Sequence, residues 1–306
     1  MKVLMATDGS QDALTAMRAA VRLVRKENSQ IQVVCVIPEL FQAKSKSRET
    51  GEESRRVRDR YRRQISRETR KILDEATGVL AEDGILAEGV MEFGSPANVI
   101  VQKAANQDLT VIGALGKYDR TRLGLGPVAN RVIESAPGMI LVGRELTPEK
   151  SLRILVGVDG SEASEQALRR LVAEFNVNSA EITLMHVVET PWIKLGLDRD
   201  FLDAPDEWSD PGDQVLHLER ELRAEAEMLV DEARRILQPY QVSIDTVIEE
   251  GNAATELLGQ VENGDYDLIV LGATGLTDLR HGLVGSVSSK VAWTASCSVL
   301  IVKTSA

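Results

Sequence analysis

Short apolar runs alternate with longer segments of helical periodicity along the whole chain. Runs such as 109–113 and 267–272 are almost continuously apolar, which is typical of strands buried on both faces of a parallel sheet. The longer segments between them repeat apolar residues at three- and four-residue intervals, which is typical of helices packed on a sheet. The alternation predicts α/β domains, in which helices cover both faces of a parallel sheet.

The same pattern gives the expected extent of each element. In the first half we expect strands at residues 2–7, 31–37, 85–92, 109–113 and 139–143, and helices at 11–26, 51–81, 96–106 and 127–136. In the second half we expect strands at 153–158, 181–188, 241–249, 267–272 and 298–303, and helices at 162–174, 213–237, 253–263 and 286–295. Ser10 is a suitable N-cap for the first helix. The dense Arg and Glu of 48–70 indicate the solvated face of a long helix rather than a binding patch.

The two halves repeat one another. Residues 2–10 return as 153–161, with the same strand followed by Asp-Gly-Ser, and residues 108–113 match 267–272. Internal repetition on this scale predicts two copies of one domain. We expect domains at 1–146 and 152–306, separated by a short polar segment that contains Pro148.

A glycine motif at the end of the fourth strand of the second half carries the candidate chemistry. Gly272 and Gly275 follow the strand, and Gly285 then opens a helix with Ser286 and Ser288 in its first turn. Glycines let main-chain N–H groups approach an anion, and a helix N-terminus offers unpaired N–H groups and a positive dipole end. The pattern is typical of phosphate binding, but taken alone it is equally compatible with a connection whose glycines only turn the chain, because short glycine motifs recur by chance.

Composition and charge narrow the classes of function. The net charge of −11 disfavours nucleic acid and anionic membranes as partners. We also expect no signal peptide and no transmembrane span, and hence a cytoplasmic protein. Cys35 and Cys297 lie in apolar runs, which favours buried thiols over a disulfide or metal site.

The repeated strand-Asp-Gly-Ser opening, together with Gly-x-x-Gly, nine residues and Gly-Ser, resembles the universal stress protein family in its tandem, two-domain form. The resemblance covers nearly the whole chain. It implies two Rossmann-like domains, each with a five-stranded parallel sheet flanked by helices, of the adenine-nucleotide alpha-hydrolase type. It also implies an ATP site in the second half, with Mg²⁺ on the phosphates. The residues that match the family's site are Val158, Asp159, Val187, Gly272, Thr274, Gly275, Gly285, Ser286, Val287 and Ser288.

Within that site the resemblance implies distinct roles. Val158 and Asp159 would lie at the nucleoside, and the main chain of Val187 would meet adenine. Asp159 has a structural alternative, since its carboxylate could instead cap the helix that starts near Glu162.

The first half departs from this motif after Gly126. Pro127 and Ala129 stand where the second half has Ser286 and Ser288, so one N–H donor and two hydroxyls are missing. We therefore expect a degenerate nucleotide site in the first domain, with its fold retained.

Three functions remain open at this point. The first is an ATP-dependent regulator that acts on an unidentified protein partner, the second a slow ATP hydrolase or nucleotide transferase, and the third a nucleotide-independent interaction module. No Gly-x-x-x-x-Gly-Lys-Ser/Thr loop is present, which favours the regulator. His281 is the candidate base for the enzyme, and 191–213 is either a lid or an insertion packed on its own domain.

The last strand of each half carries a prediction about assembly. Residues 139–143 and 299–302 are apolar and are expected at sheet edges, where exposed main-chain groups favour pairing. We expect the two domains to pair through these strands as a pseudo-dimer within the chain. Homodimers of whole chains are a further option.

Overall fold

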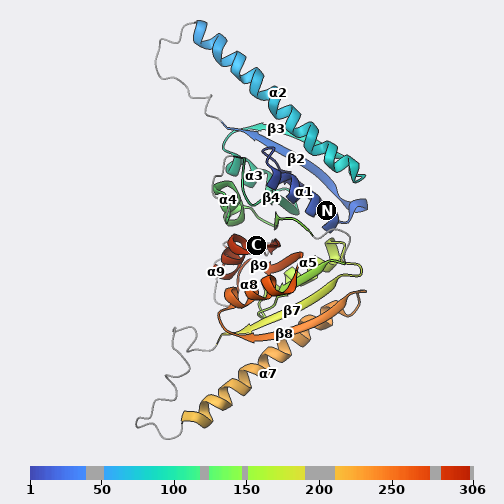
Figure 1. The fold of residues 1–306 in the computed structure, drawn as a ribbon, viewed down its shortest axis with the longest axis vertical. Helices are drawn as coiled ribbons and strands as arrows, with labels where there is room; N and C mark the ends of the chain where they lie inside the picture. The colour runs from blue at the N-terminus through green and yellow to red at the C-terminus, as the bar shows by residue number, and fades with distance from the viewer. Residues whose placement is uncertain (39–51, 118–123, 147–150, 190–210, 276–283, 304–306) are drawn as a thin grey trace. The chain divides into compact units, whose positions relative to one another are not determined.

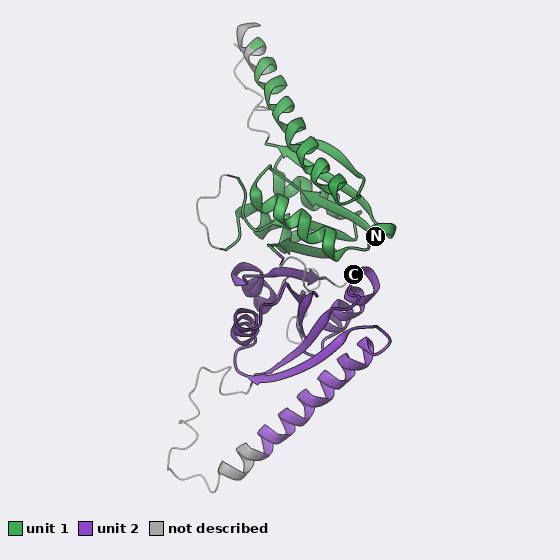
Figure 2. Cartoon of the chain, turned by 45° about the vertical axis from the view of Figure 1, so that its right-hand side comes forward, with its two compact units in different colours: residues 1–145, 305 green, residues 146–304, 306 purple. Residues whose placement is uncertain are grey.

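The computed structural model describes residues 1–38, 52–117, 124–146, 151–189, 211–275 and 284–303. The chain divides into two compact units, essentially Met1–Glu145 and Leu146–Thr304 (Figure 2). Within the described residues, no helix has the length and apolar character needed to cross a bilayer.

The described part of the first unit is a five-stranded parallel sheet in the order β3-β2-β1-β4-β5 (Figure 1). Helices α1 and α2 contact one another, as do α3 and α4, as expected for two helical layers. The strands are β1 (Lys2–Ala6), β2 (Gln30–Ile37), β3 (Ala87–Phe93), β4 (Leu109–Gly113) and β5 (Met139–Gly143). The helices are α1 (Gln11–Leu23), the short 3₁₀ helix η1 (Lys26–Asn28), α2 (Glu52–Glu82), α3 (Pro96–Ala104) and α4 (Pro127–Ser135).

The described part of the second unit repeats this arrangement, with the strand order β10-β9-β6-β7-β8, all parallel. Helix α5 contacts α7, and α8 contacts α9. The strands are β6 (Arg153–Gly157), β7 (Glu181–Val188), β8 (Ser243–Glu250), β9 (Leu268–Gly272) and β10 (Ser298–Val302). The helices are α5 (Glu162–Glu174), α7 (Pro211–Leu237), α8 (Ala253–Gly264) and α9 (Ser286–Thr294).

This architecture confirms the expected fold class, and most element ends agree within two residues. The first helix is an exception, because it was expected to reach residue 26 and ends at Leu23. Val24 leaves the helix in an extended conformation and is buried, so its side chain turns into the core instead of continuing the exposed helix. Ser10 caps α1 as expected, since its hydroxyl accepts the N–H of Ala13 at 3.2 Å.

The central strands form the core of each unit. Strand β4 is paired with β1 and β5, and β9 is paired with β6 and β10. In each unit the strand order reverses beside the first strand, between β1 and β4 in one and between β6 and β9 in the other. In sheets of this kind the carboxyl ends of the strands at the reversal form a crevice where ligands bind.

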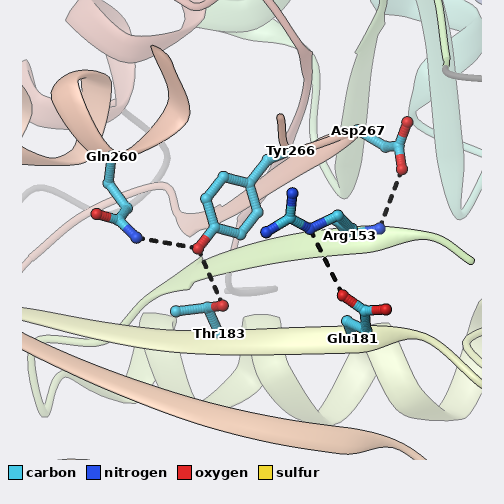
Figure 3. Close-up of polar contacts among 6 residues, drawn as sticks. All are labelled: Arg153, Glu181, Thr183, Gln260, Tyr266 and Asp267. Carbon is cyan, nitrogen blue, oxygen red and sulfur yellow. Dashed lines mark hydrogen bonds and ion pairs between the residues drawn. The ribbon is translucent and has the colours of Figure 1, made fainter. Parts of the chain in front are cut away.

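A polar cluster links the amino ends of the strands in the second unit, at the sheet edge opposite that crevice (Figure 3). The buried Tyr266 hydroxyl donates to Thr183 Oγ1 at 3.0 Å and accepts from Gln260 Nε2 at 3.1 Å. The Arg153 guanidinium lies 5.4 Å from the centre of the Tyr266 ring and 3.5 Å from Glu181 Oε2. Each hydroxyl and amide in the cluster therefore has a partner, which lets polar atoms lie in an apolar core.

Replacing Tyr266 with phenylalanine should lower the free energy of unfolding of the second domain by about 1–2 kcal/mol, because Thr183 loses its partner in a buried position. Urea unfolding followed by circular dichroism measures the change. The control is Tyr240→Phe in the same domain, which should leave the unfolding curve unchanged because the Tyr240 side chain is exposed and its hydroxyl has no hydrogen-bond partner among the described residues. Identical curves for all three proteins would show that the cluster contributes nothing to stability.

Candidate functional site

A hollow lies at the carboxyl ends of β6, β7 and β9, where the strand order of the second unit reverses. Its volume is about 650 Å³, within the range of cavities that hold small ligands and cofactors. All ten residues selected from the sequence line it: Val158, Asp159, Val187, Gly272, Thr274, Gly275, Gly285, Ser286, Val287 and Ser288. The fold thus brings together residues that are up to 130 positions apart, from Val158 to Ser288.

Asp159 lies in the turn that leads from β6 into α5. Gly160 has a φ of +76°, in the left-handed region that glycine adopts without strain, and so the chain reverses directly after the carboxylate. Asp159 Oδ1 accepts the N–H of Ser161 at 2.9 Å and its hydroxyl at 2.5 Å. The helix itself is capped by Ser161, whose Oγ accepts the N–H of Ser164 at 3.2 Å. The structural alternative considered for Asp159 is therefore wrong in detail, because Asp159 holds the capping residue and is not the cap.

The second carboxylate oxygen of Asp159 faces the glycine loop. A Cβ atom on Gly275 would lie 2.8 Å from Asp159 Oδ2, closer than real Cβ contacts. The Asp after the first strand and the glycine loop after the fourth therefore lie close together in the lining of the hollow. A side chain at position 275 would collide with the Asp159 carboxylate.

The main chain of Val187 is unpaired at the edge of the hollow. The Met185 carbonyl accepts the N–H of Val158 at 2.9 Å, so the odd-numbered residues of β7 point their N–H and C=O groups toward β6. Strand β6 ends at Gly157, which leaves the N–H and C=O of Val187 without a partner among the described residues. The Val158 carbonyl accepts a hydrogen bond from His186 Nδ1 at 2.8 Å and does not pair with the Val187 N–H. Because a carbonyl only accepts, Nδ1 carries the proton.

The first turn of α9 supplies a second set of free donors. The first intrahelical bond runs from Ser289 N–H to the Gly285 carbonyl, at 3.0 Å, and no side chain caps the helix. The N–H groups of Ser286, Val287 and Ser288 have no acceptor among the described residues, as is usual for a first turn. The hydroxyl of Ser288 is not free, because it donates to the Gly272 carbonyl at 2.7 Å. Of the two hydroxyls expected to face a ligand, that of Ser286 is exposed and has no hydrogen-bond partner among the described residues.

The charges around the hollow are unusual for a phosphate site. The ionisable residues in its lining are His186, Asp159, Glu189 and Glu225, and no Lys or Arg of the described chain lines it. Glu189 is partly committed, since its Oε1 accepts the N–H of Ala253 at the start of α8. The positive potential available to an anion in this lining therefore comes from main-chain N–H groups and the α9 dipole.

Several lining residues were not selected from the sequence. His186 directly precedes Val187 in β7, and Glu189 follows the end of that strand. Helix α7 contributes Leu222, Ala226 and Leu229 to the lining. The spacing of these three α7 residues, at intervals of four and three, is a signal for one helix face, although it does not say what that face covers. His281 and most of 191–213 lie outside the described residues. The structure therefore leaves the candidate base and the candidate lid untested.

The matching region of the first unit differs at three of these positions. Pro127 opens α4 and has no N–H, and Ala129 has no hydroxyl. Cys35 stands where the second unit has His186, and burial together with the nearby Asp8 carboxylate raises the pKa of its thiol to about 11. The thiol is consequently neutral at pH 7, and Cys35 and Cys297 are both buried, as expected from the sequence.

Comparison with known proteins identifies the family and agrees with the fold. The family model described as "Universal stress protein family" matches residues 1–144 and again residues 151–303. The chain belongs to the universal stress protein family. Its two domains are thus two universal stress domains in tandem, as expected from the repeat.

Three relatives illustrate the similarity. The universal stress protein YxiE of Bacillus subtilis is 27% identical over 151 residues, which cover 49% of this chain and 98% of that protein. A universal stress protein structure from Archaeoglobus fulgidus is 20% identical, with a TM-score of 0.63 over 99% of this chain and 98% of that chain, and it shares the fold. A universal stress protein family structure from Arabidopsis thaliana contains AMP; it is 17% identical, with a TM-score of 0.36 over 51% of this chain and 93% of that chain.

Proposed function

We propose that this universal stress protein binds ATP in its second domain and acts as a nucleotide-dependent regulator of the stress response or of survival. The observation that carries the proposal is that one hollow presents two sets of main-chain groups without partners among the described residues. The edge of Val187 lies on β7, and the three N–H groups lie on the first turn of α9. One ligand with a base at one end and phosphates at the other matches both sets.

The edge of Val187 favours adenine over guanine. An N–H donor beside a C=O acceptor complements adenine, whose N1 accepts and whose 6-amino group donates. Guanine reverses both groups, so its N1–H would face the Val187 N–H and its O6 would face the carbonyl. His186 supports this arrangement, because its bond to the Val158 carbonyl occupies an acceptor beside the base position.

The phosphates would lie against α9 and the glycine loop. The N–H groups of Ser286, Val287 and Ser288, with the Ser286 hydroxyl, form a cradle at the positive end of a helix dipole. Because the lining is acidic, Mg²⁺ bound to the phosphates would reduce their repulsion from Asp159, Glu189 and Glu225. The described residues hold no group of three His, Cys, Asp or Glu suited to a metal ion, so this Mg²⁺ would be carried mainly by the nucleotide.

Isothermal titration calorimetry of the full chain tests the proposal. We expect about one tight site per chain for Mg·ATP, and binding by GTP at least about tenfold weaker, because the base edge disfavours guanine. The nucleotide released by denaturing the purified protein should be adenine nucleotide. No heat with ATP and no released nucleotide would support a nucleotide-independent interaction module instead. Steady-state phosphate release well above that of a Ser286→Ala variant would support a hydrolase.

The output of a regulator is a partner or an assembly. The partner protein is unidentified. Strands β5 and β10 each end the strand order within their own unit and pair with β4 and β9 respectively, which keeps the expected pairing of the two domains a reasonable proposal. Further dimerisation of whole chains stays a prediction without a residue-level argument.

A further inference from the structure

The glycine loop of the first domain is occupied by carboxylates of the same domain. Asp12 Oδ2 accepts the N–H of Leu115 at 3.1 Å, and Asp8 Oδ2 accepts the N–H of Lys117 at 2.7 Å. Leu115 and Lys117 lie in the segment that follows β4, the counterpart of the loop that follows β9. Two N–H groups of this loop thus already have an anionic partner.

The first helix of each domain packs on its glycine loop in the same way. A Cβ on Gly113 would lie 2.7 Å from the main-chain carbon of Asp12, and a Cβ on Gly272 would lie 2.7 Å from that of Ala163. The next contacts also match, at 2.8 Å to the following main-chain nitrogen and 2.9 Å to the carbonyl oxygen. Residues 12 and 163 therefore hold the same place relative to the loop, and Leu115 corresponds to Thr274.

The two domains differ in the side chain at this place. The side chain of Ala163 has no group that could accept a hydrogen bond, and the N–H of Thr274 has no partner among the described residues. Thr274 also lines the hollow. The loop N–H that Asp12 occupies in the first domain is available to a ligand in the second.

We infer that Asp12 is a built-in anion that closes the glycine loop of the first domain to phosphate, and that the residue at this place, Asp12 or Ala163, decides which domain accepts a nucleotide. This inference rests on the proposed function of the second domain. The Leu115 N–H cannot donate fully to a carboxylate and to a phosphate at once. The Asp12 charge would also repel a phosphate across a short distance, and its position in the first turn of α1 stabilises that charge.

If this inference holds, the donors missing at Pro127 and Ala129 account for only part of the difference in nucleotide affinity between the two domains. A first domain with serine at both places would still hold the Asp12 carboxylate against its loop. Conversely, a second domain with aspartate at 163 would lose affinity although its motif is intact. Position 163 lies outside the glycine motif, so the motif alone does not report it.

The first test transfers the anion to the second domain. Calorimetry with Mg·ATP should show at least about tenfold weaker binding by Ala163→Asp than by the wild-type chain. Ala163→Asn, which can accept the Thr274 N–H without a charge, should lose less affinity. Ala163→Asp with wild-type affinity would overturn the inference, provided that its thermal unfolding without nucleotide confirms a folded chain.

Because Ala163 is buried at 4% exposure, a second test removes the anion from the first domain, where Asp12 is partly exposed. The triple variant Asp12→Ala, Pro127→Ser, Ala129→Ser should bind about two Mg·ATP per chain. The matched double variant Pro127→Ser, Ala129→Ser keeps Asp12 and should stay at about one. Equal stoichiometry in the double and triple variants would overturn the inference.

These outcomes are separable from failure of the proposed function. If the wild-type chain binds no ATP, the proposed function fails. If it binds ATP and the substitutions at 12 and 163 change neither affinity nor stoichiometry, only the role of the built-in anion fails.

Discussion

Replacing Ser286 with proline should weaken Mg·ATP binding by about 100-fold. The substitution removes one N–H and one hydroxyl from the α9 cradle, and hydrogen bonds to a charged group contribute about 1.5–3 kcal/mol each. Their loss amounts to about 3 kcal/mol at the lower end, which corresponds to the stated factor. Calorimetric titration of the full chain measures it.

The helix itself should tolerate this change. Proline is favoured at the first position of a helix, and α4 of the first domain begins with Pro127 at that position. Ser286→Ala separates the two contributions, since it removes the hydroxyl and keeps the N–H. Ser289→Ala is the matched control, because Ser289 is exposed, lies one residue beyond the cradle and does not line the hollow. If Ser286→Pro binds Mg·ATP with wild-type affinity, the first turn of α9 does not contact the ligand.

Replacing Asp159 with alanine should weaken Mg·ATP binding at least about tenfold, or roughly 1.4 kcal/mol. Asp159 lies in the hollow with Oδ2 directed at the Gly275 loop, where it would bond to the nucleoside. The same substitution also releases the Ser161 N–H and hydroxyl, so some loss of stability is expected without nucleotide. Calorimetry for affinity and urea unfolding for stability distinguish the two effects.

Asp8→Ala is the internal control for this experiment. Asp8 occupies the same place in the first domain, where Ser10 and Lys117 main-chain N–H groups engage its two carboxylate oxygens. We expect Asp8→Ala to destabilise the first domain and to leave ATP affinity unchanged. If Asp159→Ala loses stability while its affinity equals that of the wild-type chain, Asp159 is a structural residue only.

Much of this protein follows from local sequence pattern. Continuous apolar runs and helical periodicity depend on burial along each segment, and they predict the strands and helices of both domains because parallel sheets bury both faces. The repeat of strand-Asp-Gly-Ser predicts the duplication. The spacing of Gly272, Gly275 and Gly285 places the loop and the helix start at a strand end, and sheet topology places that end beside Asp159.

Other features are decided by contacts between residues far apart in the chain. The free edge of Val187 exists because β6 ends at Gly157 while β7 continues, a difference in strand length that no local pattern encodes. The Ser288 hydroxyl turns to the Gly272 carbonyl, 16 residues away, although the motif places it with the ligand donors. Asp12 reaches the Leu115 N–H across 103 residues, and only the packing of α1 on Gly113 brings them together. The sequence by itself determined two α/β domains, the glycine motif and the free N–H groups of the first turn of α9. Tertiary packing decided whether the Val187 edge, the Ser288 hydroxyl and the Leu115 N–H are free for a ligand, because the groups that pair with them, or fail to reach them, are distant in sequence.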